Sequence, residues 1–405
     1  MKRSFAKRGI SDTRCTIILL NYTLLLVNAL DIKMVIYGQF KWTEGKKMFE
    51  IGSRTALQLR RIGPLFIMTA AFLWTLDAFF RTFLVGTIGF ISIQIVGIEH
   101  IIIVLVLIPW LFRYLAQLRE FNKKEWAALL FIGIGGSALA TIALTEAFSL
   151  AFNPAHPLSV TMVVLLQQTQ PFIAIGLASL VLNERLPKEY FILAFIAIFG
   201  VFLIFFPTLT NYTEDLTQLF VIADIDFLAA NTLGILALVA AFFWGGSTVF
   251  GRYLLEHTQK RLEYQAMTTY RFFIAFIFLI ALNIVLILTG TTFPSTNLIL
   301  QNLFGIAWAF LFIALIVGLL SLVLYYYGLK NTHATVSTIC ELFYPLSAFV
   351  LLPILLNETL FISQIVGGLV LVLASGILSY RYSKFMRTGE SKTDQITNLE
   401  SLVTS

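Results

Sequence analysis

Long apolar runs alternate with short polar segments along most of the chain. Each run contains about 20 residues, which is enough for a helix to cross the roughly 30 Å hydrocarbon layer of a membrane. The apolarity is continuous rather than alternating, and this favours helices over barrel strands. The pattern predicts ten transmembrane helices, at about residues 65–84, 88–112, 126–149, 158–182, 190–206, 232–254, 264–289, 302–327, 334–356 and 360–380.

The composition points to the same class. Of the 405 residues, 58% are hydrophobic and 12% are charged, whereas a soluble domain has about 25% charged residues. Lipid offers no partner to backbone N–H and C=O groups, so a spanning segment must satisfy them internally, as a helix does. We therefore expect an all-α integral membrane protein that crosses the lipid bilayer many times.

Lys and Arg are concentrated in every second segment between the predicted spans. If residues 41–63 lie inside, the inside segments and the C-terminal tail hold nearly all of the positive residues, and the outside segments hold only Arg81, at a span end. The connection at 207–231 carries acidic residues and no basic one. This asymmetry follows the positive-inside rule. It predicts a cytoplasmic C-terminus, in the cell (inner) membrane if the source is bacterial, and no nucleic-acid partner.

Residues 1–63 form a basic extension that fits the span pattern less well. The apolar run at 16–30 follows several basic residues, as in a signal peptide, but a second basic stretch comes after it and should stay inside. The run is also short for a span. We interpret the extension as a cytoplasmic or interfacial segment. The alternative is a misassigned start, with Met34 or Met48 as the true first residue.

One stretch of the fourth predicted span occurs twice. In "QPFIAIGLASLVLNERL" and "YPLSAFVLLPILLNETL", Glu184 follows Pro171 by thirteen positions and Glu358 follows Pro345 by the same number. Two further pairs stand in the same order along the chain, "AFLW" at 71–74 with "AFFW" at 241–244, and "IEH" at 98–100 with "YRF" at 270–272. The common order and the similar spacing indicate an internal duplication.

Each copy contains five predicted spans, at residues 64–207 and 232–382. An extramembrane linker at 208–231 joins them, and a cytoplasmic polar tail follows at 383–405. Because five is odd, the second copy must enter the membrane in the opposite sense. Inverted repeats are a recurring design of secondary transporters, in which a central site opens to the two faces in turn.

These features resemble the EamA family of the drug/metabolite transporter superfamily: Trp in the first span, "YRF" in the second, and the Pro…Asn-Glu motif in the fourth. The resemblance covers about residues 64–382 and implies two inverted five-helix repeats, alternating access, and a site between the halves. Gln170 and Tyr344 stand before the motif prolines, where the family commonly has Glu. Glu99 stands where it commonly has Arg, which Arg271 retains. These departures leave substrate and coupling ion open.

Ionisable side chains inside spans are costly and tend to face the protein interior. The deep candidates are Asp77, Glu99, Glu146, Arg271 and Glu341, with His100 beside Glu99. Arg271 and Glu341 lie at similar depths, so we expect them to pair, either as a structural ion pair or as a gate. The excess of carboxylates suits proton coupling or an amine-bearing substrate, and hydrogen bonding at helix ends is the alternative for Asp77 and Glu146.

Polar and aromatic residues supply further candidates for lining a substrate cavity. Amides read hydrogen-bonding groups, and aromatic faces accept cations or flat rings; the candidates are Trp74, Gln167, Gln170, Trp244, Tyr326 and Tyr344. Pro171 and Pro345 should each bend the fourth span of their copy, as a fixed kink or as a moving part. "GIGGSALA" at 133–140 should let helices approach closely.

Together these features predict a secondary active transporter that moves small organic metabolites by alternating access. Its substrate would be amino-acid-like, nucleotide-related or drug-like, with protons as the candidate coupling ion and a monomer or homodimer as the working form. The sequence carries no ATP-binding, catalytic, metal or cofactor motif, so we expect neither an enzyme nor a metal or cofactor site. The alternatives are an intramembrane lipid-processing enzyme and a non-transporting receptor or assembly factor.

Overall fold

The computed structural model describes residues 48–152, 158–212, 225–257, 264–332 and 334–403. The chain divides into two units, Met1–Leu57 and Gln58–Ser405. Most of the first unit lies outside the described residues, and so does most of the basic extension at 1–63. The described part of the extension is helical, because α3 begins at Met48 and continues through Pro64 into the first span.

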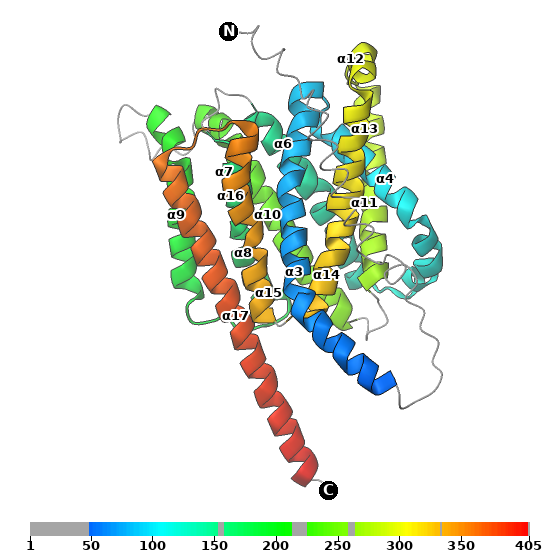
Figure 1. Ribbon diagram of the computed structural model, residues 1–405, viewed down its shortest axis with the longest axis vertical. Coiled ribbons are helices and arrows are strands. Elements are labelled where there is room, and N and C mark those ends of the chain that lie inside the picture. The colour runs from blue at the N-terminus through cyan, green and yellow to red at the C-terminus, as the bar shows by residue number, and fades with distance from the viewer. Residues whose placement is uncertain (1–47, 153–157, 213–224, 258–263, 333, 404–405) are drawn as a thin grey trace. The chain divides into compact units, whose positions relative to one another are not determined.

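Every regular element in the described residues is helical, as expected for an all-α membrane protein (Figure 1). The first half consists of α3 (Met48–Thr82), η2 (Phe83–Ile88), α4 (Ser92–Tyr114), η3 (Leu115–Glu120), α5 (Lys123–Leu130), η4 (Phe131–Leu139), α6 (Ala140–Ala151), α7 (Val160–Leu166), η5 (Gln167–Thr169), α8 (Gln170–Val181) and α9 (Tyr190–Tyr212). The second half consists of α10 (Ile225–His257), α11 (Tyr264–Leu288), α12 (Thr296–Gln301), α13 (Leu303–Leu311), η7 (Phe312–Leu320), α14 (Ser321–Asn331), α15 (Ala334–Glu341), α16 (Phe343–Leu356) and α17 (Ile362–Val403).

Nine helical segments of the described chain are long and apolar enough to cross a membrane. They correspond to all but one of the ten expected spans. The remaining one, Tyr190–Phe206, is an apolar helix that is shorter than the others. The multi-pass character of the protein is therefore confirmed, and the count of ten stays a prediction.

The third span of each half contains a nine-residue π-helical segment, η4 in the first and η7 in the second. η4 covers most of the glycine-rich stretch, and its glycines lie against neighbouring helices as expected. A Cβ on Gly136 would overlap Ser247 Oγ, and one on Gly133 would stand 3.2 Å from the Arg271 carbonyl oxygen. Side chains at these positions would push α10 and α11 away from the third span.

The Asn of the repeated motif has a local structural role. Asn183 and Asn357 end the fourth span of each half with φ of 55° and 54°, in the left-handed region. Asn tolerates this conformation better than most residues other than glycine. The backbone N–H of Glu358 then donates to Pro353 O at 3.0 Å, which satisfies a carbonyl of the last helical turn. The motif therefore stops the helix and turns the glutamate away from its axis.

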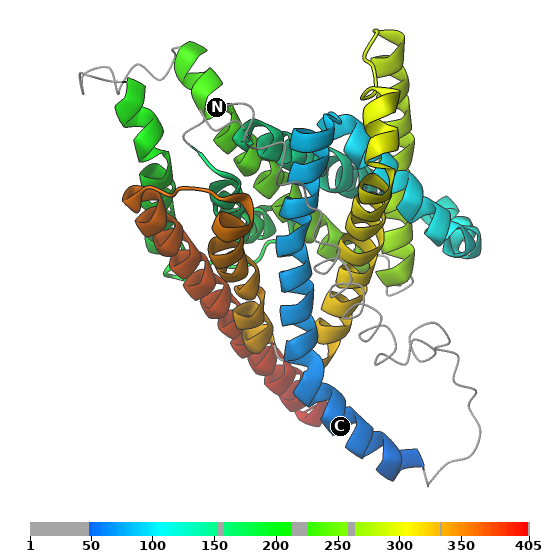
Figure 2. The same ribbon diagram turned by 45° about the horizontal axis from the view of Figure 1, so that its top comes forward.

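The two halves meet through matched interfaces. The first span of each half packs on the fourth span of the other: Thr75 Oγ1 donates to Tyr344 O at 3.2 Å, and a Cβ on Gly245 would stand 3.1 Å from Gln170 O. Positions 75 and 245 correspond to each other in the sequence repeat, and so do positions 170 and 344. In both ribbon views α3 lies between α16 and α14, and α9 runs beside α17 (Figures 1 and 2).

Candidate functional site

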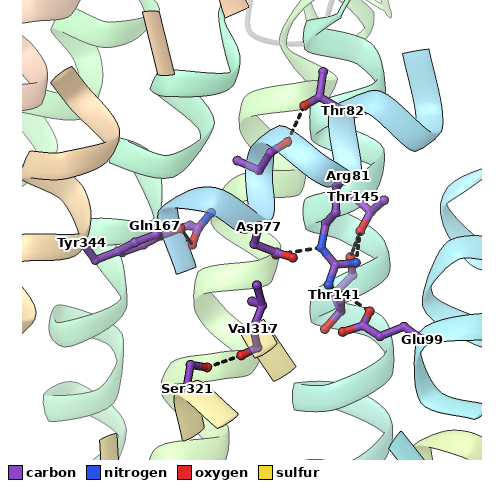
Figure 3. Close-up of polar contacts among 11 residues, drawn as sticks. Asp77, Arg81, Thr82, Glu99, Thr141, Thr145, Gln167, Val317, Ser321 and Tyr344 are labelled. Carbon is purple, nitrogen blue, oxygen red and sulfur yellow. Dashed lines mark hydrogen bonds and ion pairs between the residues drawn. The ribbon is translucent and has the colours of Figure 1, made fainter. Parts of the chain in front are cut away.

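Three charged side chains meet in the first half, away from the surface. Arg81 on α3 donates through Nε to Asp77 Oδ2 at 2.7 Å and through Nη2 to Glu99 Oε2, on α4, at 2.9 Å. Its Nη1 donates to Thr145 Oγ1, on α6, at 3.2 Å. Figure 3 shows the guanidinium between the two carboxylates. One cation therefore joins three helices of the first half and partners two carboxylates.

The burial of Arg81 corrects the expectation that it marks the outer end of the first span. Its exposed fraction is 2%, and the first span runs on through η2 to Ile88. Arg81 thus lies about two helical turns inside the span, where a charge needs a partner. A signal was available: Asp77 and Arg81 stand four residues apart, the spacing that places two side chains on one helix face.

Glu99 and its neighbour His100 have separate surroundings. Glu99 is 4% exposed, and its Oε1 lies 3.7 Å from the position that a Cβ would take on Gly318, in η7. His100 forms a hydrogen bond between Nδ1 and Val96 O at 2.8 Å. The His100 ring lies 5.5 Å from the ring of Phe272. The two side chains therefore do not form a pair in this structure.

Arg271, which occupies the position of Glu99 in the second half, has a neutral partner. Its Nε donates to Ser137 Oγ, in η4, at 2.7 Å. Glu341 accepts a hydrogen bond from Tyr325 OH at 2.8 Å. In the described residues these two side chains form no ion pair with each other, contrary to the expected pairing. Each side chain instead bonds to a polar residue of another helix: Arg271 to Ser137, in the third span of the first half, and Glu341 to Tyr325, in the third span of the second half.

The α-helical pattern of the fourth span is interrupted in the middle in both halves, although the backbone there stays in the right-handed helical region. In the first half a 3₁₀ turn, Gln167–Thr169, separates α7 from α8, and in the second half α15 ends at Glu341 and α16 begins at Phe343. Pro171 and Pro345 lie in the first turn of the segments that follow. The expected bend at each proline stays a prediction. A first turn accepts proline because its N–H groups have no helical partner there.

The amide of Gln167, in the 3₁₀ turn of the first half, lies near the aromatic residues Trp74, Tyr325 and Tyr344. Tyr344 OH donates to Gln167 Oε1 at 3.2 Å. The ring of Trp74 lies 6.3 Å from that of Tyr344 and 5.3 Å from that of Tyr325. Gln167 is 4% exposed, and Figure 3 shows it with Tyr344 on the side of Asp77 opposite to Glu99. The structure thus brings several of the sequence-predicted residues into one region, Trp74, Asp77, Glu99, Gln167 and Tyr344.

The other predicted residues have different surroundings. Glu146 accepts a hydrogen bond from Ser92 Oγ. Trp244 packs on the hydrophobic core, and its carbonyl accepts from Thr248 Oγ1 at 3.1 Å. The Tyr326 ring lies 5.7 Å from that of Tyr325, its neighbour in the run of three tyrosines at 325–327. Gln170 contributes its backbone carbonyl to the contact with α10.

The two motif glutamates lie in different chemical environments. Glu184 is bound by the guanidinium of Arg252 and by the hydroxyl of Tyr382. Glu358 accepts from the backbone N–H groups of Val160 at 2.7 Å and Thr161 at 3.2 Å, and from the Thr161 hydroxyl. The first is an ion pair between side chains, and the second caps the N-terminus of α7, where a negative charge is favourable.

Comparison with known proteins gives two results. Residues 61–206 and 232–380 each match the EamA-like transporter family, so both copies of the repeat are covered. The chain is also 28% identical over 262 residues to a protein of Fusobacterium nucleatum subsp. nucleatum described as "Riboflavin transporter ImpX", a match that covers 64% of this chain and 78% of that protein. With the multi-pass helical fold, these matches point to transport rather than enzymatic catalysis. The chain belongs to the EamA-like transporter family.

Proposed function

We propose that this protein is a secondary transporter that carries riboflavin, or a closely related flat metabolite, across the cell membrane by alternating access. The relative described as a riboflavin transporter supports the substrate. The observation that carries the proposal is the buried polar region between α3, α14 and the broken fourth spans, because buried polar groups at membrane depth mark solute pathways.

The matched interfaces support the transport cycle. The first span of each half packs on the fourth span of the other half, through Thr75 in the first half and Gly245 in the second. Two interfaces built alike can exchange roles, one loosening as the other tightens. The breaks in the fourth spans give each of those helices two segments that can tilt separately, while the carbonyls freed at the break stay inside the protein.

Proton coupling is the second part of the proposal. Asp77 and Glu99 share one guanidinium, so the group carries one negative charge in excess. At membrane depth such an excess favours the uptake of a proton by one carboxylate. A proton that enters with the solute and leaves on the other side would couple transport to the proton gradient.

The proposed orientation follows the charge distribution, with the C-terminus in the cytoplasm and the linker at 208–231 outside. A fluorescent-protein fusion at the C-terminus and a cysteine introduced into the linker for labelling by a membrane-impermeant maleimide test this arrangement. If the maleimide labels the linker only from the cytoplasmic face, the proposed orientation is wrong. Native mass spectrometry of the detergent-solubilised protein distinguishes a monomer from a homodimer.

Riboflavin uptake into proteoliposomes tests the function. We expect saturable uptake above that of protein-free liposomes, and faster uptake when the lumen is more alkaline than the bath. Glu99→Gln should remove the response to the pH gradient and retain riboflavin exchange between the two sides. Uptake no faster than in protein-free liposomes contradicts transport of riboflavin, and an unchanged pH response in Glu99→Gln contradicts the proposed route of the proton.

A further inference from the structure

Two buried polar atoms in the candidate site have no hydrogen-bond partner in the described structure, Asp77 Oδ1 and Gln167 Nε2. Buried polar groups in proteins are nearly always hydrogen-bonded, so each exception calls for an explanation. A carboxylate oxygen can only accept a hydrogen bond, and an amide nitrogen can only donate one. The pair therefore presents one acceptor and one donor.

The remaining atoms of both side chains are held by other partners. Asp77 Oδ2 is bound by Arg81 Nε at 2.7 Å. Gln167 Oε1 accepts from Tyr344 OH at 3.2 Å, which sets the amide with its nitrogen toward the unpaired side. Figure 3 shows Gln167 and Tyr344 together on one side of Asp77. The side chains of Asp77 and Gln167 thus lie in the same region, and their neighbours fix which one accepts and which one donates.

Aromatic rings lie beside this pair. Trp74 stands three residues before Asp77 on α3, which places both side chains on one face of the helix. The Trp74 ring is 5.3 Å from the Tyr325 ring and 6.3 Å from the Tyr344 ring. Trp74, Asp77, Tyr325 and Tyr344 each keep part of their surface exposed at the depth of the spans. A flat ring can pack on such faces.

The second half has no equivalent pair. In the sequence repeat, Ser247 takes the position of Asp77 and Glu341 takes the position of Gln167. Glu341 is bound by Tyr325. Ser247 Oγ also lacks a partner, but it is packed against Gly136 rather than beside an unpaired donor. The acceptor–donor pair therefore occurs in the first half and is not repeated at the corresponding positions of the second half.

We propose that Asp77 and Gln167 recognise the lactam or imide edge of a planar heterocycle: a ring N–H donates to Asp77 Oδ1, and the adjacent ring carbonyl accepts from Gln167 Nε2. This inference rests on the transport function proposed above and names the chemistry that selects the substrate. The isoalloxazine ring of riboflavin carries such an edge, an N–H (N3) between two carbonyls, and so do pterin and pyrimidine rings.

The same pair disfavours other substrate classes. A carboxylate or phosphate would meet Asp77 and be repelled by its negative charge. An ammonium group could bind Asp77, but it has no acceptor for Gln167 Nε2 and would leave that donor buried and unpaired. A site built to hydrogen-bond a substrate group rejects the analogue that lacks it more strongly than an apolar pocket rejects a change of shape. Discrimination should therefore depend on the ring N–H.

Binding of riboflavin and of 3-methylriboflavin, in which a methyl group replaces the N3 hydrogen, tests the inference. The full-length protein in nanodiscs is titrated, and quenching of flavin fluorescence is recorded. We expect riboflavin to bind at least about tenfold more tightly than its methyl derivative. Gln167→Leu should weaken riboflavin binding at least about tenfold, and Asp77→Leu should reduce the ratio of the two affinities to near one.

Two further variants separate recognition from folding. Gln167→Asn retains an amide donor and should recover part of the riboflavin affinity that Gln167→Leu loses. Ser247→Ala, the matched change in the second half, removes an unpaired buried hydroxyl outside the pair and should leave both affinities unchanged. All variants are compared by size-exclusion profile and thermal unfolding, so that a loss of affinity in a well-folded variant reports on recognition.

The outcomes distinguish this inference from the proposed function. Transport of riboflavin with equal affinity for its methyl derivative, or with discrimination retained in Gln167→Leu, overturns the inference and leaves the function standing. Discriminating binding without uptake in proteoliposomes overturns the function and leaves the inference standing. If riboflavin, lumazine and uracil all fail to bind the wild-type protein, the inference is overturned.

Discussion

The two halves of the protein share several backbone features and differ in the chemistry of their buried side chains. Both have a nine-residue π-helical segment in the third span, a broken fourth span, and an Asn in the left-handed conformation at its end. Yet the positions of Asp77 and Arg81 are taken by Ser247 and Gly251 in the second copy of the repeat. The buried charge triad therefore exists in the first half alone among the described residues.

This difference shows that the repeat supplies the geometry of the interfaces and not the chemistry of the buried polar side chains. Matched backbones give two interfaces of similar geometry, which is what an alternating-access cycle needs. The chemistry that would hold a solute is a separate requirement, and nothing in the backbone match demands that it be repeated in the second half. The replacement of the family's usual Arg by Glu99 fits this division: Arg81 supplies the positive charge from α3, and Arg271 keeps the family residue with Ser137 as its partner.

Removal of Arg81 should have the largest effect on this comparison. Arg81→Leu leaves Asp77 and Glu99 buried without a cation, and breaking such a pair costs about 3–5 kcal/mol. We expect a large fall in thermal unfolding temperature and loss of transport, both measured in the purified protein. The triple variant with Asp77→Asn and Glu99→Gln added should recover much of the stability. Wild-type stability in Arg81→Leu alone would show that the triad is unimportant for the fold.

The matched change in the second half should cost less. Arg271→Met removes a side chain that donates to the hydroxyl of Ser137. Because this partner is neutral, its loss leaves no carboxylate without a cation. We expect a loss of about 1.5–3 kcal/mol, the range for a hydrogen bond to a charged group. Thermal unfolding of both variants in the same detergent gives the comparison. A larger loss for Arg271→Met than for Arg81→Leu would reverse our ranking of the two halves.

The two motif glutamates should also respond unequally. Glu358→Ala exposes unpaired N–H groups at the start of α7 and should cost about 1–2 kcal/mol, as for the loss of a strong N-cap. Glu184→Ala breaks an ion pair whose Arg252 side chain is 37% exposed, so we expect about 1 kcal/mol or less. Thermal unfolding at low and at high salt separates the two, because salt should reduce the contribution of the partly exposed Glu184–Arg252 ion pair more than that of Glu358, whose hydrogen bonds to backbone N–H groups remain. Equal losses with an equal response to salt would contradict this difference between the two glutamates.

The smallest effect should come from the two Asn residues, and it should be the same in both halves. Asn183→Gly and Asn357→Gly replace a residue at φ of 55° or 54° with one that adopts this conformation freely. Each change should alter the free energy of unfolding by less than about 0.5 kcal/mol. Ala at either position should destabilise by about 1 kcal/mol. Unequal effects of the two Ala variants would show that the left-handed turns are not equivalent.

Much of this architecture could be predicted from the sequence because it depends on patterns along the chain. Continuous apolar runs identified the spans, and the glycines of 133–140 predicted close helix packing, as Gly136 against Ser247 confirms. The repeat boundaries at 64–207 and 232–382 and the ten-helix count stay predictions. The spans and the glycine-rich stretch could be predicted because each follows from composition or spacing within a single segment.

The site was harder to predict because it depends on contacts between segments. Arg81 was misplaced because hydropathy gives the end of a span only to within a few residues, and one turn decides whether a side chain is at the surface or inside. The 3₁₀ turn at Gln167–Thr169 coincides with a cluster of polar residues before Pro171, which the sequence offered as cavity-lining candidates and not as the end of a helix. Tyr325 gained its role only through Trp74 and Glu341, which come from other helices.

The crossing of the last helices of the two halves has a mechanical consequence. A Cβ on Gly200 would stand 2.9 Å from Gly367 O, and a Cβ on Gly367 would stand 2.6 Å from Gly200 O, so backbone meets backbone where α9 passes α17. The nearest side-chain atoms at this crossing are the Cβ atoms of Leu203 and Leu371, so only small groups separate the two backbones. Any added side chain at Gly200 or Gly367 would therefore act as a spacer that pushes the last helices of the two halves apart.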